Sequence, residues 1–196
     1  MITVGAYVGP RALAPATIEA VMVTVNSINT CPYCTGLHGE LARMASAVVD
    51  KKAPEVVYAT VFAEECGRGA RVQAAYSKLA SSIGEGRALS VRALCWALLW
   101  GKTTGNTINA VRGKLLSSRW FKTSPFELAV FAFYGPLFLV IGVTNTLLAK
   151  LPPVPGWLST LIGVGLWVPQ AVHLTSAGLV SLGMRLLAAP FAGFNL

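Results

Sequence analysis

Charged residues are scarce in this chain, and acidic residues are absent from its C-terminal part. Only 12% of the 196 residues are charged while 54% are hydrophobic, a balance unusual for a water-soluble protein. No Asp or Glu follows Glu127, and beyond Ala149 the only formal charges are Lys150 and Arg185. This distribution predicts a polar, amphipathic part followed by an oily part, and it indicates that water does not surround the whole protein.

Clusters of basic residues interleaved with aromatics are also missing. The net charge of +8 comes from Lys and Arg residues scattered singly through amphipathic segments, which is not the pattern of a nucleic-acid interface. Arg112, Lys114, Arg119 and Lys122 instead precede the first long apolar run, where anionic lipid headgroups would meet them. We therefore expect a lipid bilayer as a partner and no nucleic acid.

Cysteines are too few for a secreted fold held together by disulfides. Cys31, Cys34, Cys66 and Cys95 are the only four, which favours a reducing compartment and one redox-active pair. The first twenty residues lack a basic region followed by an apolar one, so we expect no signal peptide.

Strand-like alternation is absent from the first part of the chain, which is expected to be all-α. Apolar residues recur there at helical spacing, and Pro or Gly residues separate the segments. Thr30 is expected to cap the second helix, whose first turn tolerates Pro32. The pattern predicts helices over residues 15–28, 31–49, 54–66, 70–83, 88–100 and 106–117, with a link from Gly101 to Gly105 between the last two.

Two long uncharged runs predict a membrane hairpin. No formal charge occurs from Leu128 to Ala149, and His173 is the only ionisable side chain from Leu151 to Met184. Either run exceeds the roughly 20 residues that cross a hydrocarbon core of about 30 Å. The proline-rich turn between them is so short that the spans must be antiparallel. Central helices of a soluble bundle are the alternative, but the prolines and glycines of these runs are more common in membrane spans.

The hairpin also predicts a topology and a division of the chain. Basic residues are denser at the outer ends of the hairpin than in its turn, where Lys150 stands alone. The N-terminal domain, residues 1–118, is therefore expected on the cytoplasmic, matrix or stromal side, for example of a thylakoid or inner mitochondrial membrane. Residues 119–196 would form the hydrophobic hairpin and tail.

His173 is an ionisable group within an apolar run, and such a residue is a functional candidate by default. It is a candidate axial ligand to a haem or a chlorophyll. The alternative is a histidine near the membrane surface or one bonded to a neighbouring helix. Ligation by two histidines of the hairpin is excluded, because the hairpin offers only one.

The stretch NTCPYCTGLH, residues 29–38, places two cysteines and a histidine on one face of the expected helix. Sulfurs three residues apart can form a disulfide, and the first turn of a helix favours thiolate over thiol. His38 can hydrogen-bond or deprotonate Cys34, directly or through water. Helix position favours Cys31 as the more acidic sulfur and the histidine favours Cys34, so the sequence leaves this choice open.

Other interpretations compete for the cysteine pair. Zinc would need a fourth ligand and normally a second Cys/His pair, but Cys66 and Cys95 are single and distant, so no metal is expected. Thioredoxin-like chemistry would need a strand before the motif, where an amphipathic helix is expected. Two small buried cysteines beside a hydrogen-bonded histidine form the plain structural alternative.

Glu19 extends the motif upstream, as an acidic residue on an otherwise apolar helix. The stretch EAVMVTVNSINTCPYCTGLHGELA resembles the alkylhydroperoxidase AhpD-like and carboxymuconolactone decarboxylase family. That family's peroxidase motif is a Glu, eleven intervening residues and then Cys-x-x-Cys-x-x-x-His. Glu19, Cys31, Cys34 and His38 match each of its spaced positions.

The resemblance implies a thiol peroxidase or disulfide reductase that needs no cofactor for its thiol chemistry. Cys34 would attack the peroxide and become a sulfenic acid, Cys31 would resolve it to a disulfide, and His38 with Glu19 would relay protons. The peroxidases carry a further histidine between the cysteines, where this chain has Tyr33. The decarboxylase branch lacks the cysteine pair, so lactone decarboxylation is not expected.

The expected architecture is an all-α protein, with an AhpD-like helical domain followed by a two-helix transmembrane hairpin. The first functional hypothesis is a membrane-anchored antioxidant protein of the thiol-disulfide or peroxidase type. The second is a non-enzymatic accessory subunit of a photosynthetic or respiratory membrane complex, such as a photosystem, in which the motif is structural or vestigial. The apolar tail makes the second credible, because the family is generally soluble. Partners in such a complex, or a homo-oligomer, are expected.

Overall fold

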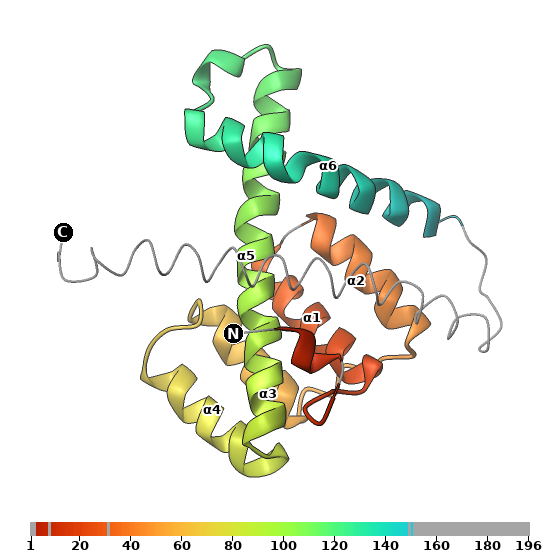
Figure 1. Ribbon diagram of the computed structural model, residues 1–196, viewed down its shortest axis with the longest axis vertical. Coiled ribbons are helices and arrows are strands. Elements are labelled where there is room, and N and C mark those ends of the chain that lie inside the picture. The colour runs from red at the N-terminus through yellow and green to blue at the C-terminus, as the bar shows by residue number, and fades with distance from the viewer. Residues whose placement is uncertain (1–2, 8, 31, 149, 151–196) are drawn as a thin grey trace.

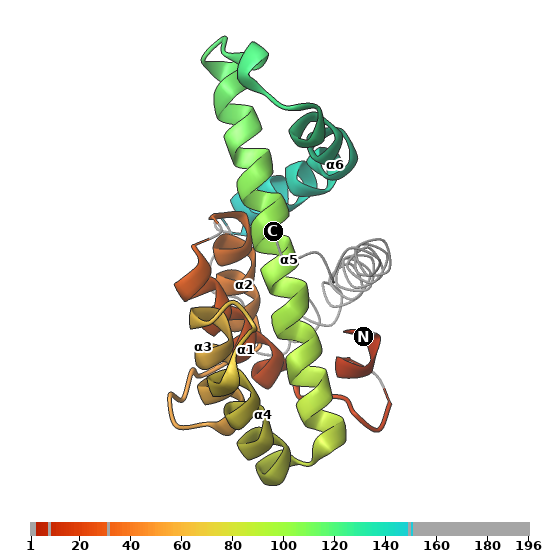
Figure 2. The same ribbon diagram turned by 90° about the vertical axis from the view of Figure 1, so that its left-hand side faces the viewer.

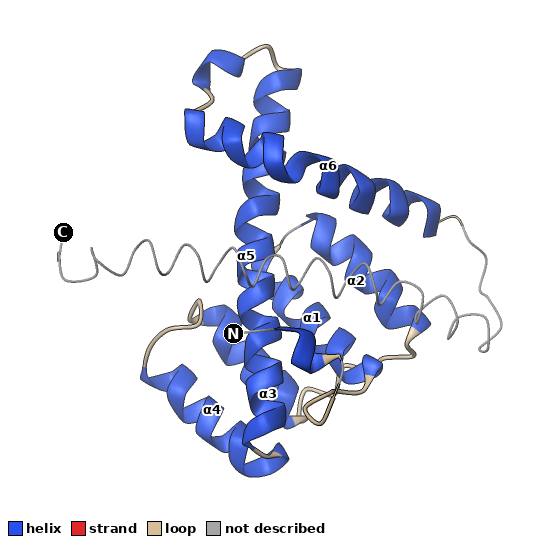
Figure 3. Cartoon of the chain, in the orientation of Figure 1, coloured by secondary structure: helices blue, strands red, loops and turns tan. Residues whose placement is uncertain are grey.

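The computed structural model describes residues 3–7, 9–30, 32–148 and 150, and every regular element in these ranges is a helix, as Figure 3 shows. The all-α prediction is therefore confirmed for this part of the chain. His173 and the second apolar run lie outside it. The elements in chain order are the 3-10 turn η1 (Thr3–Ala6), α1 (Pro15–Asn29), α2 (Pro32–Met44), α3 (Pro54–Glu64), α4 (Ala70–Ile83), α5 (Glu85–Leu116), the 3-10 turn η2 (Trp120–Lys122) and α6 (Pro125–Leu148).

The long helix α5 is the scaffold on which the other helices pack. Figure 1 shows α1, α3 and α4 around the lower half of α5 and α6 crossing its upper half, and Figure 2 shows η1 on the opposite side of α5 from α3. The main core joins η1, α1, α3, α4 and α5 around buried side chains such as Met22, Phe62 and Leu94. Full burial of one such side chain contributes about 1.5–3 kcal/mol relative to exposure.

Local sequence signals explain where several helices begin. Pro15, Pro54 and Pro125 each stand at the first position of a helix, where the missing N–H breaks no hydrogen bond. α6 also has a capping box, in which the Ser124 N–H donates to Glu127 Oε2 at 2.7 Å and the Glu127 N–H donates to Ser124 Oγ at 3.2 Å.

An ion pair holds the start of α6 against the end of α5. Lys114 Nζ lies 2.7 and 2.9 Å from the two carboxylate oxygens of Glu127. This lysine, together with the Ser124 backbone N–H, lowers the pKa of Glu127. The connection through η2 is thereby fixed at both ends.

The expected break from Gly101 to Gly105 is wrong, because α5 runs through these residues without interruption. Gly101, Thr104 and Gly105 are all buried. The Thr104 hydroxyl donates to the carbonyls of Trp100 and Gly101, at 2.9 and 3.2 Å, so its polar group is satisfied within the helix. Small residues let neighbouring helices approach here, and this packing outweighs the low helix propensity of glycine.

Thr30 ends α1 and does not cap α2, contrary to expectation. Its φ of 54° is left-handed, and its N–H donates to the Asn26 carbonyl at 2.9 Å, which is the geometry of a helix C-terminus. α2 stops at Met44, about five residues before the predicted end, and Ser46 follows with a φ of 50°. The helices predicted over residues 15–28, 54–66 and 70–83 are found within two residues of those bounds.

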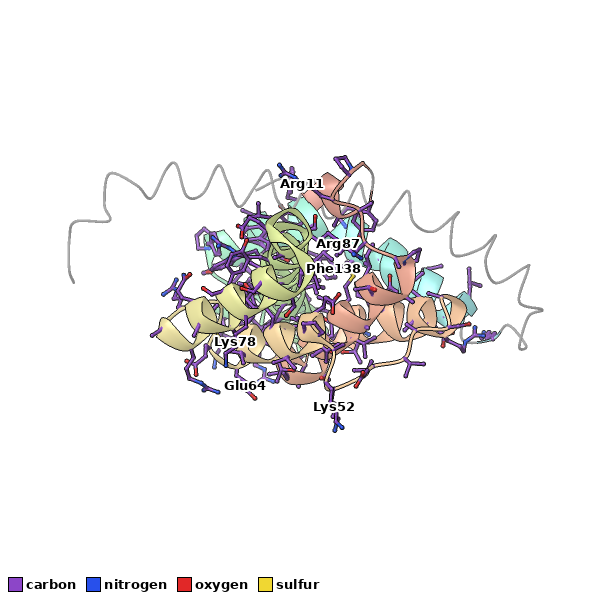
Figure 4. The ribbon with its side chains drawn as sticks, turned by 90° about the horizontal axis from the view of Figure 1, so that it is seen from below. Arg11, Lys52, Glu64, Lys78, Arg87 and Phe138 are labelled. Atoms are coloured by element: carbon purple, nitrogen blue, oxygen red, sulfur yellow. The ribbon has the colours of Figure 1, made fainter. Side chains whose placement is uncertain are left out.

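α6 covers the first of the two predicted membrane spans, and it packs against α2 and α5. Phe138 is only 2% exposed, and Figure 4 shows it in the interior, whereas Lys52 and Glu64 lie at the periphery. Within the described ranges, none of the helices combines the length and the apolar character that a membrane crossing requires. The predicted transmembrane hairpin is therefore not supported by this part of the chain.

We expect Gly67 to tolerate alanine worse than Gly69 in the link from α3 to α4. Both have a positive φ, of 74° and 93°, but a Cβ at Gly67 would lie 2.7 Å from the Phe62 ring, whereas the space at Gly69 is open. Gly67→Ala should lower the free energy of unfolding by about 1–3 kcal/mol more than Gly69→Ala, because it adds a clash to similar backbone strain. Urea unfolding measures the difference, and equal losses would contradict this packing.

Candidate functional site

Two buried polar side chains meet where α1 packs on α2. His38 Nδ1 lies 3.0 Å from Glu19 Oε2, and the residues are 6% and 5% exposed. A carboxyl and an imidazole are rarely buried to this extent unless they are partnered. The bond assigns Nδ1 to the carboxyl and leaves Nε2 as the nitrogen that can exchange a proton with another group.

The hairpin formed by α1 and α2 explains this meeting. Only Thr30 and Cys31 separate the two helices, so they run in opposite directions, and the early part of α1 lies level with the later part of α2. Glu19 belongs to the face of α1 that also carries Met22 and Asn26, which follow at helical spacing and are likewise buried. This face therefore looks toward the neighbouring helices and away from solvent.

Cys34 lies one helical turn before His38 on α2 and is half-buried. Residues four apart share a helix face, so its sulfur and the imidazole belong to the same side of α2. α5 lies close to this sulfur, since a Cβ added at Gly101 would be 4.0 Å from Cys34 Sγ. The sulfur thus sits between α2 and α5. Cys31 lies outside the described ranges, so its pairing with Cys34 stays a prediction.

Tyr7 adds a hydroxyl group near Glu19 from the N-terminal segment. It is 8% exposed, and burial, followed by the charge of the Glu19 carboxylate, raises the pKa of Tyr7 well above its ordinary value. A phenol in this setting stays protonated throughout the physiological range. The carboxyl of Glu19 therefore has a neutral neighbour on one side and the imidazole on the other.

Two buried asparagines continue the polar face of α1 beyond Met22. Asn26 and Asn29 are each 2% exposed. Asn29 Oδ1 accepts a hydrogen bond from Lys102 Nζ at 2.9 Å, and Lys102 directly follows Gly101. In the part of the chain that the structure describes, neither side-chain polar atom of Asn26 has a partner, and Asn29 Nδ2 has none. Such groups cost about 1–3 kcal/mol each to bury and mark a place for water or a polar ligand.

The sequence marks these additional residues weakly or not at all, for different reasons. Asn26 and Asn29 follow Glu19 by seven and ten residues, on one face of a largely apolar helix, and this signal could have identified them. Lys102 reaches Asn29 from 73 residues away in the chain, and no local pattern marks it. Tyr7 likewise comes from a separate segment.

The arrangement is suited to moving protons near a sulfur. Over the described ranges, no group of three His, Cys, Asp or Glu side chains could hold a metal ion. The Glu19 carboxyl can stabilise a protonated His38, and the imidazole can exchange that proton with a nearby thiol or oxygen.

Comparisons of the chain with family models, with curated proteins and with solved structures found no match. The resemblance carried by Glu19, Cys31, Cys34 and His38 is therefore an expectation that rests on the motif alone.

Replacing Asn26 with leucine should stabilise the protein. Asn26→Leu removes two buried polar atoms that have no partner among the described residues, so the free energy of unfolding should rise by about 1 kcal/mol or more. Asn29→Leu is the matched control, since it also removes the acceptor of Lys102 and should be less favourable. Urea unfolding of the two variants decides the matter, and a clear loss for Asn26→Leu would show that its amide is satisfied.

Proposed function

We propose that the protein is a thiol-based redox enzyme of the peroxidase or disulfide-reductase type, with Cys34 as its attacking sulfur. The proposal rests mainly on one observation, the hydrogen bond between the buried Glu19 and His38, one helical turn from a half-buried cysteine. A reactive thiol needs a neighbouring base and a polar, partly accessible setting. The half-burial of Cys34 and its place one helical turn from His38 support this role.

The proposed peroxidase reaction begins with the Cys34 thiolate, whose proton has passed to His38. The sulfur attacks one peroxide oxygen, the O–O bond breaks, and the leaving alkoxide takes the proton from the imidazolium, so an alcohol departs and a sulfenic acid remains. The Cys31 thiol then attacks this sulfur, which releases water and forms the Cys31–Cys34 disulfide. An external dithiol reduces the disulfide and becomes oxidised itself.

Lys102 has a consistent role in this proposal. Lys102, held by Asn29 next to Gly101, brings a positive charge to the part of α5 that faces Cys34. A nearby cation favours the thiolate and stabilises negative charge on a leaving oxygen.

The other described cysteines differ from Cys34 in ways that help a test. Cys95 is 0% exposed, and burial raises the pKa of its thiol, so it should be inert in the folded protein. Cys66 is exposed in the link after α3, remote in sequence from Glu19 and His38. Cys66→Ser is therefore the matched control for changes at Cys34.

Treatment of the full chain with a small hydroperoxide should remove two thiols per molecule. Thiol counting before and after treatment should show this loss in the wild type and in Cys66→Ser but not in Cys34→Ser. Glu19→Gln keeps a polar group of similar size and removes the charge, so it should slow the loss by at least about tenfold. Thiols that stay unreactive in the wild type, or a loss that Cys34→Ser does not affect, would exclude the proposed enzyme.

A second candidate function is that of a non-enzymatic subunit anchored in a membrane complex. One face of α6 supports it, because large apolar side chains are exposed there, and the uncharged run 151–184 adds to it from the sequence. The exposed side chains of α6 are Phe126, Leu128, Phe133, Leu139, Val143 and Leu147. In this candidate the bilayer and partner subunits would cover the face, with the N-terminal helices on the cytoplasmic, matrix or stromal side. His173 would then be a ligand to a haem or chlorophyll.

Alkaline carbonate extraction tests the membrane anchor separately from the thiol chemistry. The full chain should stay with the membrane pellet, because carbonate strips proteins held by charge but not those held by apolar segments. Isolation in a mild detergent should then recover any partner subunits and bound pigment. Release of the chain into the soluble fraction would exclude anchoring and leave the enzyme proposal intact.

A further inference from the structure

A polar cleft lies between the α3–α4 link and α5, built from residues other than those around Cys34. Its volume is about 460 Å³, within the roughly 300–1,000 Å³ of small-molecule sites. Its floor and walls combine two arginines with hydroxyl, amide and aromatic groups. They include Tyr58, Arg68, Gln73, Tyr76, Arg92 and Trp96.

α4 begins at the rim of this cleft with open backbone N–H groups. Gly69 precedes the helix with a φ of 93°, and no side chain caps it. Gln73 is the first residue whose N–H reaches a helical acceptor, the Gly69 carbonyl at 3.3 Å. The N–H groups of the preceding turn are left to an outside acceptor, and the positive end of the helix dipole favours an anion there.

Two arginines and no acidic residue line the cleft. The neighbouring acids Glu64 and Glu65 are both paired with Arg71. Arg68 and Arg92, in contrast, make no ion pair with any residue that the structure describes.

Arg92 is held in place at the wall of the cleft. Its guanidinium lies over the ring of Tyr76, with the central carbon 4.8 Å from the ring centroid. The Tyr76 hydroxyl in turn donates to Glu85 at 2.7 Å. Stacking of this kind pre-organises a guanidinium for an oxyanion.

A buried hydroxyl on one of the lining residues, Tyr58, points to a ligand independently of the helix end. Tyr58 is 1% exposed, and its hydroxyl has no hydrogen-bond partner within the described ranges. Leaving such a group unpaired costs free energy unless something binds it. Burial raises the pKa of Tyr58, so the group remains a hydrogen-bond donor at any physiological pH.

We propose that this cleft binds the phosphate group of a small molecule, between the N-terminus of α4 and the guanidinium groups of Arg68 and Arg92. The donors are the backbone N–H groups of the first turn, the two guanidinium groups and the Tyr58 hydroxyl. These are more donors than the two oxygens of a carboxylate can use, whereas a phosphate offers three equivalent acceptors. The site does not depend on the proposed thiol chemistry.

Calorimetric titration of the purified full chain in mild detergent tests the site with two probes, inorganic phosphate and adenosine monophosphate, at constant ionic strength. Arg68→Gln and Arg92→Gln should each weaken binding by roughly tenfold, the loss expected for one charge-assisted hydrogen bond. Arg87→Gln is the matched control, because Arg87 also lies on α5 but, as Figure 4 shows, on the side toward Arg11. It should bind both probes like the wild type.

Tyr58→Phe provides a second variant that removes one oxygen and no charge. It should weaken binding several-fold while leaving the thermal unfolding midpoint of the free protein unchanged or higher. Tighter binding of adenosine monophosphate than of inorganic phosphate would identify a phosphorylated small molecule as the ligand, and equal binding would identify free phosphate. The proposal is overturned if neither probe binds at millimolar concentration, or if Arg87→Gln weakens binding as much as the two cleft variants do.

Discussion

The hydrogen bond between Glu19 and His38 is the constraint on which the rest of the site depends. Both groups are almost fully buried, and neither could be left alone in an apolar interior at a small cost. Their bond therefore fixes the register of α1 against α2. Because Cys34 is one turn away on the same helix, that register also determines where its sulfur meets α5.

Much of the fold could be predicted from the sequence, because prolines and glycines mark the ends of amphipathic segments. The error at Gly101 to Gly105 arose because helix propensity acts locally, whereas the small side chains there serve contacts with distant helices. The error at Thr30 arose because threonine is common at the N-terminus of a helix. Here Thr30 adopts a left-handed conformation and ends α1. The Ser-Pro-Phe-Glu stretch that begins α6 is likewise a local signal of a helix start.

The candidate site could be predicted only where its members share a short stretch of chain. Cys34 and His38 are four residues apart on α2, so helical geometry places them on one face, and the short link between α1 and α2 brings Glu19 next to that face. Lys102 and Tyr7 reach the same place through tertiary packing, to which no local pattern corresponds. Asn26 and Asn29 of α1 could be predicted in part. Their spacing shows that they share a helix face with Glu19, but it does not specify which residues they contact.

The continuity of α5 has a mechanical consequence. Arg92 and Trp96 line the polar cleft, and Gly101 lies against the sulfur of Cys34, so a single straight rod about 14 Å long at 1.5 Å per residue joins the two places. A continuous helix is one of the rigid elements that can carry coupling between two places. A shift of α5 at Gly101 would therefore move the residues that line the cleft, and a ligand in the cleft that shifts α5 would in turn alter the surroundings of Cys34.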